Sequence, residues 1–91
     1  VLSYCHYTLQ DTSLDTLLPY LMARNLGVIN AAPLGMGLLS DREPVSWHPA
    51  APELKAAARR AAEHCAKQGV ALSDLALSFS VQRPDIATTL V

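Results

Sequence analysis

The segment from residue 27 to residue 37 has residue types suited to binding a ligand through the backbone. It starts with two β-branched residues that favour an extended strand, and Pro33 then interrupts any strand ladder. Gly35 and Gly37 allow backbone angles and close approaches that a side chain would block. Because ligands collect outside the carboxyl ends of strands in parallel α/β folds, we expect this strand end to lie near a ligand.

Two pairs of adjacent cysteine and histidine are the other groups with potential chemistry, because both residue types are common zinc ligands. Cys5 precedes His6, and His64 precedes Cys65. Neighbouring side chains diverge on a strand and lie ~100° apart on a helix, so neither pair readily chelates one ion. We therefore predict no metal site and assign these residues structural or surface roles. The alternative for His6 is that it faces the mouth of a binding site, since it lies close to the carboxyl end of a strand.

The elements that position these residues follow an α/β pattern. Residues 1–9 are typical of a buried strand, and residues 14–25 of a helix that Pro19 should bend or split. A second strand is predicted over residues 27–32. The connection over residues 33–50 is long enough to be functional or well packed against its neighbours.

The second half of the chain predicts two helices and a third strand. An alanine-rich helix is expected over residues 52–68, followed by a helix over residues 74–82 that Ser73 caps. The third strand begins at Ile86. Because strands and helices alternate without hairpin signals between strands, the sequence predicts a parallel sheet with right-handed crossovers.

Two faces at helical spacing are predicted to be buried. The first consists of leucines: Leu14, Leu17, Leu18 and Leu21. The second consists mostly of small residues: Leu54, Ala57, Ala58, Ala61 and Cys65. Tyr4 and Tyr7 are also interpreted as packing residues rather than acid catalysts, because no lysine or similar group that would perturb a tyrosine is near them.

The composition is apolar for so short a chain. Hydrophobic residues make up 51% of it and charged residues 16%, against an average near ~25% charged. We therefore expect part of the apolar surface to be covered by polypeptide outside these 91 residues. The strand-like runs at both ends, residues 1–5 and 86–91, agree with a piece of a larger fold.

Charge and composition argue against several classes of partner. A formal net charge of −1 gives no electrostatic basis for binding nucleic acid or a membrane surface. No apolar run approaches the ~18 to 20 residues of a membrane span, and no signal-peptide pattern is present. Two cysteines without secretory features favour reduced thiols, and therefore a cytoplasmic location.

Trp47-His48-Pro49 lies just before a helix that opens with Pro-Glu-Leu-Lys at residues 52–55. Further matching segments are the first strand, the loop over residues 33–39, and the closing helix and strand from Leu75 to Val91. In this combination the chain resembles the aldo-keto reductases, most nearly their L-galactose dehydrogenase branch. The resemblance covers essentially the whole chain.

The resemblance implies a (β/α)8 TIM barrel, of which residues 1–91 would be the C-terminal part, about strands six to eight with their helices. It implies an NAD(P)-dependent oxidoreductase, with NAD or NADP as cofactor, that transfers hydride to or from a small carbonyl or sugar substrate. The family's tetrad of Asp, Tyr, Lys and His would lie upstream of Val1, so no residue here receives a catalytic role. The parent protein is therefore expected to be an enzyme, and the isolated piece to be inactive.

The family's loop after the seventh strand lies over the cofactor pyrophosphate and binds it mainly with backbone groups. The resemblance carries this role over to six consecutive residues: Ala32, Pro33, Leu34, Gly35, Met36 and Gly37. Exposed amides at a turn are able to bind an anion without a charged side chain. Arg42 lies near a position where relatives place a basic residue against the phosphates.

Two positions depart from the family pattern. Ala31 stands where many relatives stack an aromatic ring on the nicotinamide, and Leu2 stands where they hold its carboxamide with glutamine. Asn30 is a polar alternative nearby, but adjacent strand residues point to opposite faces, which would turn Asn30 toward the helices. The second phosphate site would begin beyond Val91, so residues 1–91 do not indicate a choice between NAD and NADP.

Three alternatives remain open on the sequence. Trp47 and His48 would line a substrate entrance, although we prefer that Trp47 covers the barrel edge and Pro49 orders the loop. Residues 69–84 resemble half of a helix-turn-helix DNA-binding unit, but their second helix lacks a basic face. The third alternative is a non-catalytic nucleotide-binding subunit on the same fold, which the upstream tyrosine and lysine positions would distinguish.

Overall fold

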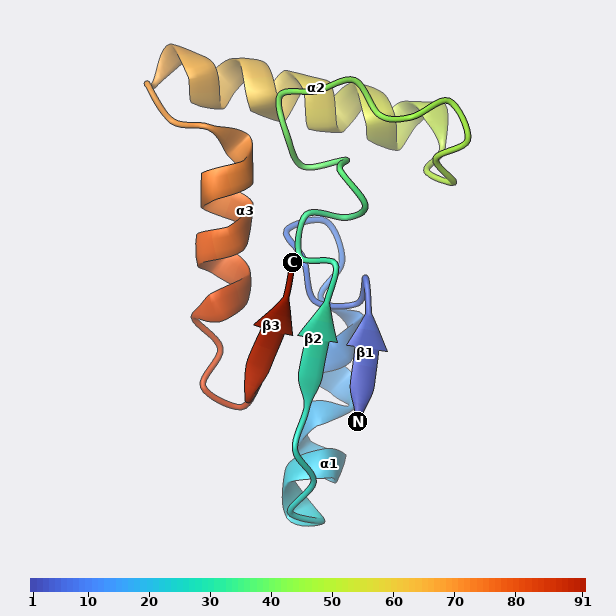
Figure 1. Cartoon of the computed structure of the whole chain (residues 1–91), viewed down its shortest axis with the longest axis vertical. Helices are drawn as coiled ribbons and strands as arrows, with labels where there is room; N and C mark the ends of the chain where they lie inside the picture. Colours follow the sequence, from blue (N-terminus) through green and yellow to red (C-terminus); the bar gives the residue numbers. More distant parts are fainter.

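Three short parallel strands form a sheet at the centre of the computed structural model, which describes residues 1–91 (Figure 1). The elements in chain order are β1 (Leu2–Tyr4), the 3-10 helix η1 (Ser13–Thr16), α1 (Leu18–Ala23), β2 (Ile29–Ala31), α2 (Pro52–Lys67), α3 (Leu72–Val81) and β3 (Thr88–Leu90). The strands pair in the order β1-β2-β3. The predicted alternation of strands and helices and the predicted parallel sheet are both confirmed.

The register places equivalent residues side by side across the three strands. These rows are Leu2, Ile29 and Thr88; Ser3, Asn30 and Thr89; and Tyr4, Ala31 and Leu90. Because the strands are parallel, their carboxyl ends meet at one edge of the sheet (Figure 1). The loops that follow β1 and β2 leave from that edge, next to the C-terminus of the chain.

The strands are shorter than the sequence predicts. β1 covers three residues of the predicted 1–9, and β2 covers three of the predicted 27–32. Both strands end where the next residue has a left-handed backbone, with φ of 62° at Cys5 and 60° at Ala32. A left-handed residue cannot extend a strand, and the residue types give no signal for it because neither residue is glycine.

Pro19 divides the predicted helix over residues 14–25, as expected. The first part is the 3-10 helix η1, and Pro19 lies in the first turn of α1, where its missing N–H removes no helix hydrogen bond. Three of the four predicted leucines are buried, but Leu17 is 43% exposed. It lies at the junction of the two helices, and the tighter winding of the 3-10 turn rotates it away from the shared face.

The face of α2 also differs from the predicted one. Ala58 and Cys65 are buried and Ala62 packs beside them, whereas Leu54 and Ala61 are exposed. These three small residues follow the i, i+4, i+7 spacing of a single helical stripe. The prediction is thus confirmed for Ala58 and Cys65 and wrong for Leu54 and Ala61, because the stripe that meets the rest of the molecule begins one turn after Leu54.

Ser73 does not cap α3. The helix begins at Leu72, after Ala71 in an extended conformation, and no side chain caps its first turn. Leu72 is almost fully buried against Leu39, Cys65 and Ala76. Packing of this leucine therefore starts the helix two residues before the position that capping chemistry predicts.

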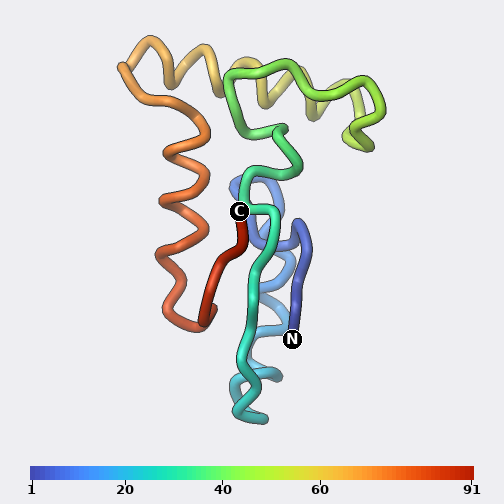
Figure 2. The backbone as a smooth tube through the Cα atoms, viewed as in Figure 1, coloured from blue at the N-terminus to red at the C-terminus, as the bar shows by residue number.

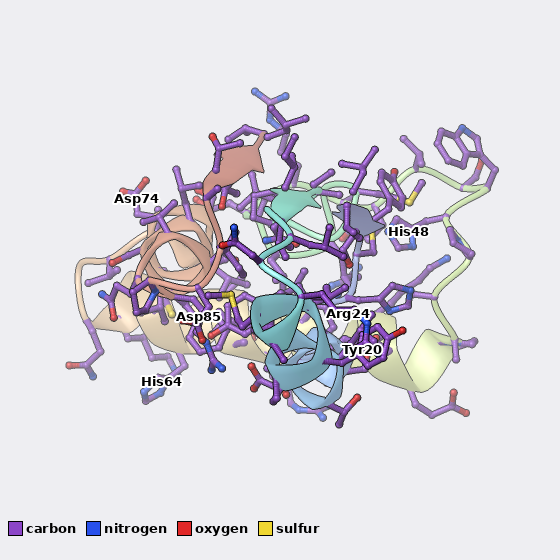
Figure 3. All side chains as sticks on the ribbon, turned by 90° about the horizontal axis from the view of Figure 1, so that it is seen from below. Tyr20, Arg24, His48, His64, Asp74 and Asp85 are labelled. Atoms are coloured by element: carbon purple, nitrogen blue, oxygen red, sulfur yellow. The ribbon has the colours of Figure 1, made fainter.

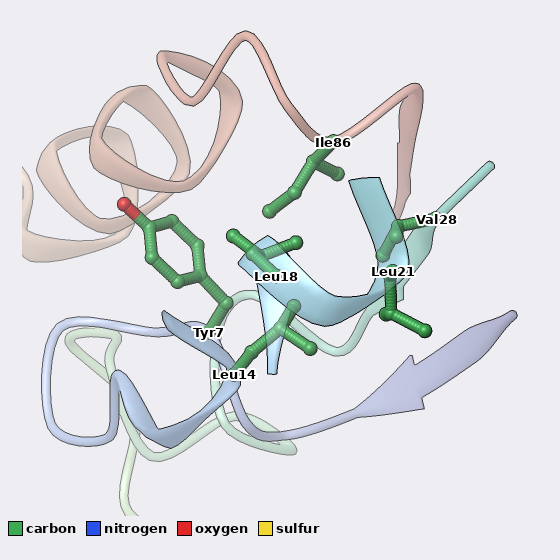
Figure 4. Packing of buried hydrophobic residues seen from close by; sticks show 6 residues of the cluster. All are labelled: Tyr7, Leu14, Leu18, Leu21, Val28 and Ile86. Atoms are coloured by element: carbon green, nitrogen blue, oxygen red, sulfur yellow. The ribbon is translucent and has the colours of Figure 1, made fainter. Parts of the chain in front are cut away.

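The main core lies between the sheet and the helices behind it. Its buried side chains are Tyr7, Leu14, Leu18, Leu21, Val28 and Ile86 (Figure 4). The ring of Tyr7 stacks on Phe79 of α3 with centroids 5.3 Å apart. Tyr7 is thus a packing residue, as predicted, while Tyr4 is 53% exposed on the sheet. The second, smaller cluster of Leu39, Cys65, Leu72 and Ala76 joins the long loop to α2 and α3.

One face of the sheet is open. α1 lies behind the sheet, and side chains project from the strands on the opposite side without a covering element (Figure 3). The apolar residues exposed there include Leu2, Tyr4 and Leu90, each more than half exposed. The buried middle row, with Ser3 and Asn30, points to the helix side instead.

The chain path leaves the molecule more extended than its length predicts. The loop over residues 32–51 runs away from the sheet to α2, and the chain returns through α3 to β3 (Figure 2). The radius of gyration is 13.9 Å, against about 12 Å for a compact domain of this length. None of the helices combines the length and the apolar character needed to cross a membrane.

Candidate functional site

The loop after β2 begins with two consecutive turns. Gly35 donates its N–H to the carbonyl oxygen of Ala32 (3.0 Å), which closes a turn around Pro33. The fixed φ of proline suits the second position of such a turn. Leu38 then donates to the carbonyl oxygen of Gly35 (3.2 Å), which closes the next turn. The loop is also tied to the sheet, because the Ala32 N–H donates to Leu90 of β3 (3.1 Å).

Four residues of this loop have a left-handed backbone. The φ angles are 60° at Ala32, 61° at Gly35, 60° at Met36 and 87° at Gly37. Glycine adopts this region freely, but Ala32 and Met36 each lose about 1 kcal/mol or more there. Strained backbone at residues other than glycine clusters at functional sites, where surrounding contacts hold it in place.

Within residues 32–37, three amides donate no hydrogen bond to the rest of the chain. They belong to Leu34, Met36 and Gly37. Backbone N–H groups carry partial positive charge and normally find a partner, so unpaired ones at a turn form a binding site for an anion. A pyrophosphate is such an anion, and the residues present therefore fit the group that the sequence predicts for this loop.

His48 contacts the second turn from the far end of the long loop. Its side chain is buried, and its Nε2 lies 2.8 Å from the carbonyl oxygen of Gly35. Its Nδ1 accepts a hydrogen bond from the Ala50 N–H (3.1 Å). Because a backbone N–H only donates, Nδ1 is the acceptor and Nε2 carries the ring proton. The neighbouring Trp47 is 70% exposed and covers nothing in this chain.

Arg42 lies beyond the two turns, with an exposed side chain. Its N–H donates to Ser40 Oγ (3.3 Å), and Ser40 Oγ donates to the carbonyl oxygen of Gly37 (2.8 Å). The Arg42 backbone is thus fixed to the turn, but its guanidinium makes no hydrogen bond to residues 32–37. That side chain lines a hollow of about 560 Å³ between the loop and α2, beside the ion pair of Arg59 and Glu43.

The loop after β1 carries His6 and Cys5 at the same edge of the sheet. His6 Nδ1 lies 3.1 Å from Ser13 Oγ and 3.6 Å from Asp11 Oδ2, on an exposed surface. Hydrogen bonding from the Ser13 side chain, and then from the Ser13 N–H, lowers the pKa of the Asp11 carboxyl group. Partial burial raises the pKa of the Cys5 thiol. No cluster of three or more His, Cys, Asp or Glu side chains is placed to hold a metal ion.

The sequence model of the aldo/keto reductase family matches residues 1–91. The chain belongs to the aldo/keto reductase family. It is 48% identical over 91 residues to L-galactose dehydrogenase of Arabidopsis thaliana, and 39% identical over 83 residues to D-arabinose 1-dehydrogenase of Saccharomyces cerevisiae. All of the chain aligns with the first and 89% with the second. The resemblance inferred from the sequence is therefore confirmed.

These matches cover only part of the relatives. The chain spans 28% of the plant enzyme and 25% of the yeast enzyme, about a quarter of each. The chain contains three strands. The remaining three quarters or so of each relative lie outside the aligned region.

The two positions that depart from the family pattern both lie on the open face of the sheet. Leu2 is 64% exposed, and Ala31 is in the adjacent strand with its small side chain on the same face. Asn30 points the other way, because its Nδ2 donates to the carbonyl oxygen of Tyr7 (3.2 Å). Asn30 faces the helix side, as predicted, and its Oδ1 is buried without a partner.

The sequence did not reveal that His48 contacts Gly35. The two residues are 13 positions apart, and no helical or strand periodicity links them. Only the tertiary path of the loop brings the ring to the turn. Trp47-His48-Pro49 stands out in the sequence by its residue types, but nothing in it points to Gly35.

Proposed function

We propose that the full-length protein containing this segment is an NAD(P)-dependent oxidoreductase that transfers hydride between the nicotinamide and an aldose or another carbonyl or alcohol substrate. Membership of the aldo/keto reductase family supports this proposal. Both relatives are named as sugar dehydrogenases, which supports a sugar as the substrate class. The activity is proposed for the longer protein, since the chain spans about a quarter of the relatives.

The observation that carries the proposal is the set of unpaired amides in the loop after β2. In this proposal Ala32 to Gly37 bind the pyrophosphate of the dinucleotide, with the N–H groups of Leu34, Met36 and Gly37 as donors. The Arg42 side chain adds a positive charge near the same anion. Bound NAD or NADP supplies or accepts the hydride at C4 of the nicotinamide.

We further propose that β1, β2 and β3 are the last three strands, about six to eight, of a (β/α)8 barrel. The open face with Leu2, Tyr4 and Leu90 then faces the barrel interior, which explains why apolar side chains lie exposed there. Ligands of such barrels bind at the carboxyl ends of the strands. That is the edge where the loop over residues 32–51 begins.

Residues 1–91 hold the cofactor in this proposal and do not transfer the proton. Tyr7 is buried in the core, and Tyr4 has no lysine as a hydrogen-bond partner. The general acid or base therefore comes from the part of the protein outside this segment. Ala31, which is buried in β2, has too small a side chain to stack on the nicotinamide.

The test is a fluorescence titration that measures binding of NAD and of NADP to the full-length protein. Saturable binding of at least one dinucleotide is expected, and failure to bind either would contradict the proposal. Turnover is then measured with L-galactose, D-arabinose and simple aldehydes. A protein that binds the dinucleotide, oxidises or reduces none of them, and lacks Tyr and Lys at the tetrad positions is the non-catalytic subunit instead.

A further inference from the structure

His48 occupies an unusual place for a histidine in a surface loop. It is 8% exposed, and both ring nitrogens form hydrogen bonds to backbone groups rather than to side chains or solvent. Its Nε2–H donates to the carbonyl oxygen of Gly35, and its Nδ1 accepts from the Ala50 N–H. The bond to Gly35 joins the two ends of the long loop.

The carbonyl that His48 binds belongs to the same peptide group as the Met36 amide. A trans peptide group is planar, and its C=O and N–H point in opposite directions. No peptide bond in the chain is cis. Fixing the Gly35 oxygen toward His48 therefore aims the Met36 N–H away from His48, and that N–H is one of the three within residues 32–37 that have no partner in the chain.

The backbone conformation around the peptide group between Gly35 and Met36 needs a stabilising contact such as the hydrogen bond from His48. Gly35 and Met36 are both left-handed, and Met36 gains nothing from that conformation by itself. The Leu38 N–H also donates to the Gly35 oxygen, at a longer distance of 3.2 Å. Without His48, only that bond would oppose rotation of the peptide group, which would turn the Met36 N–H away from its ligand.

We propose that His48 is a positioning residue for the dinucleotide: it holds the 35–36 peptide so that the Met36 N–H points at the pyrophosphate. This inference rests on the proposed function, because it takes the anion at the loop to be the cofactor. His48 itself does not touch the cofactor. Its effect is to prepare the amide before the ligand arrives, which lowers the cost of ordering the loop on binding.

Two amide substitutions separate the two hydrogen bonds of the ring. Glutamine places an N–H₂ donor at the ε position and is able to keep the bond to Gly35. Asparagine places its amide at the δ position, where it accepts from Ala50 but does not reach Gly35. Because each variant keeps one of the two bonds and loses the other, each is the control for the other.

The experiment uses the full-length protein and measures the Kd for NAD and NADP by fluorescence. His48→Asn is expected to raise the Kd about tenfold, the size of one hydrogen bond to a charged group. His48→Gln is expected to stay within about threefold of the wild type. In steady state, His48→Asn should raise the KM for the dinucleotide and leave kcat unchanged, which a general loss of structure would not do.

A second readout does not depend on the variants. Nitrogen NMR of the His48 ring in the free protein should show the neutral form with the proton on Nε2, in agreement with the two hydrogen bonds. A proton on Nδ1 would overturn the proposal. If His48→Asn does not fold, the proposal is tested by this spectrum and by the folded His48→Gln variant. A tenfold loss of dinucleotide affinity in His48→Gln also overturns the proposal.

The outcomes separate the two proposals. A wild-type protein that binds neither dinucleotide contradicts the proposed function itself. A wild type that binds, together with a folded His48→Asn variant of equal affinity, leaves the proposed function standing and overturns only the positioning role of His48.

Discussion

Gly37 is the residue of the loop at which the backbone requirement is easiest to isolate. Its φ is 87°, and a Cβ built there would meet no atom within 4 Å. A substitution is therefore strained by conformation alone and not by crowding. Gly27 offers the matched control, because a Cβ there is equally free and its backbone has no positive φ.

We predict that Gly37→Ala lowers the free energy of unfolding by about 1 kcal/mol and weakens dinucleotide binding, because alanine resists the left-handed region. Gly27→Ala should be neutral or slightly stabilising. Denaturant unfolding and a fluorescence titration of the full-length protein check both variants. Equal effects of the two substitutions would show that the loop does not require its left-handed turn.

Arg42 is predicted to act through charge. Arg42→Ala should raise the Kd for the dinucleotide by about two- to fivefold, and the difference should shrink as salt is added, because exposed charges are screened. The control is Arg24→Ala, which removes the same charge from an arginine stacked on Tyr20 near the end of α1. If both variants bind equally well at low salt, Arg42 has no role at the phosphates.

Asp11 is expected to make the free energy of unfolding depend on pH. Its pKa is lowered in the folded chain by the hydrogen bond from Ser13, so the folded state binds fewer protons than the unfolded state in acid. The stabilising contribution is complete at neutral pH and is lost as pH falls from about 4 through the lower, folded pKa. Unfolding of Asp11→Asn should therefore depend less steeply on pH in this range. An unchanged slope would contradict the assignment.

At the scale of elements, the small cluster of Leu39, Cys65, Leu72 and Ala76 holds the loop, just after residues 32–37, against α2 and α3. Leu72 is 2% exposed there, whereas Leu75, one turn along the same helix, is 46% exposed. Packing next to residues 32–37 thus supports the segment that carries the N–H groups of Leu34, Met36 and Gly37. Losing that packing should affect both stability and cofactor binding.

Leu72→Ala is predicted to lower the free energy of unfolding by about 2 to 5 kcal/mol, because it leaves a cavity in a well-packed site. Leu75→Ala should change it by no more than about 0.5 kcal/mol. Thermal or denaturant unfolding of the full-length protein measures both. A small effect of Leu72→Ala would mean that the cluster does not anchor the loop.

Much of the element order could be predicted from the sequence, because proline, glycine and the change of hydrophobic period mark where helices and strands alternate. Pro19 divides the helix and Pro52 starts α2, as their chemistry requires. The strand ends at Cys5 and Ala32 could not be predicted, since no local signal announces left-handed backbone at residues other than glycine. The contact of His48 with Gly35 could not be predicted either, because it depends on the path of the whole loop.

The whole molecule has more surface than a compact domain of its mass. Its accessible area is 5789 Å², against about 5,200 Å² expected for a folded monomer of this mass. Exposed apolar residues on the open face account for part of the difference. β1 and β3 are also edge strands, with unpaired backbone groups on their outer sides.

We therefore predict that the isolated 91-residue chain associates with itself and is inactive toward sugars and aldehydes. Analytical ultracentrifugation should show a mass that rises with concentration, and a dye for apolar surfaces should bind. A monomer that melts cooperatively and binds no such dye would contradict the first part. Any turnover by the purified piece would contradict the second.

The central claim is that the backbone of Ala32 to Gly37 binds the pyrophosphate of a nicotinamide dinucleotide. Titration of NAD and NADP into the full-length protein and its Gly37→Ala and Gly27→Ala variants tests it most directly. We predict saturable binding of at least one dinucleotide, weakened in Gly37→Ala and preserved in Gly27→Ala. Absence of binding to both dinucleotides in the wild type, or equal binding in all three proteins, would contradict it.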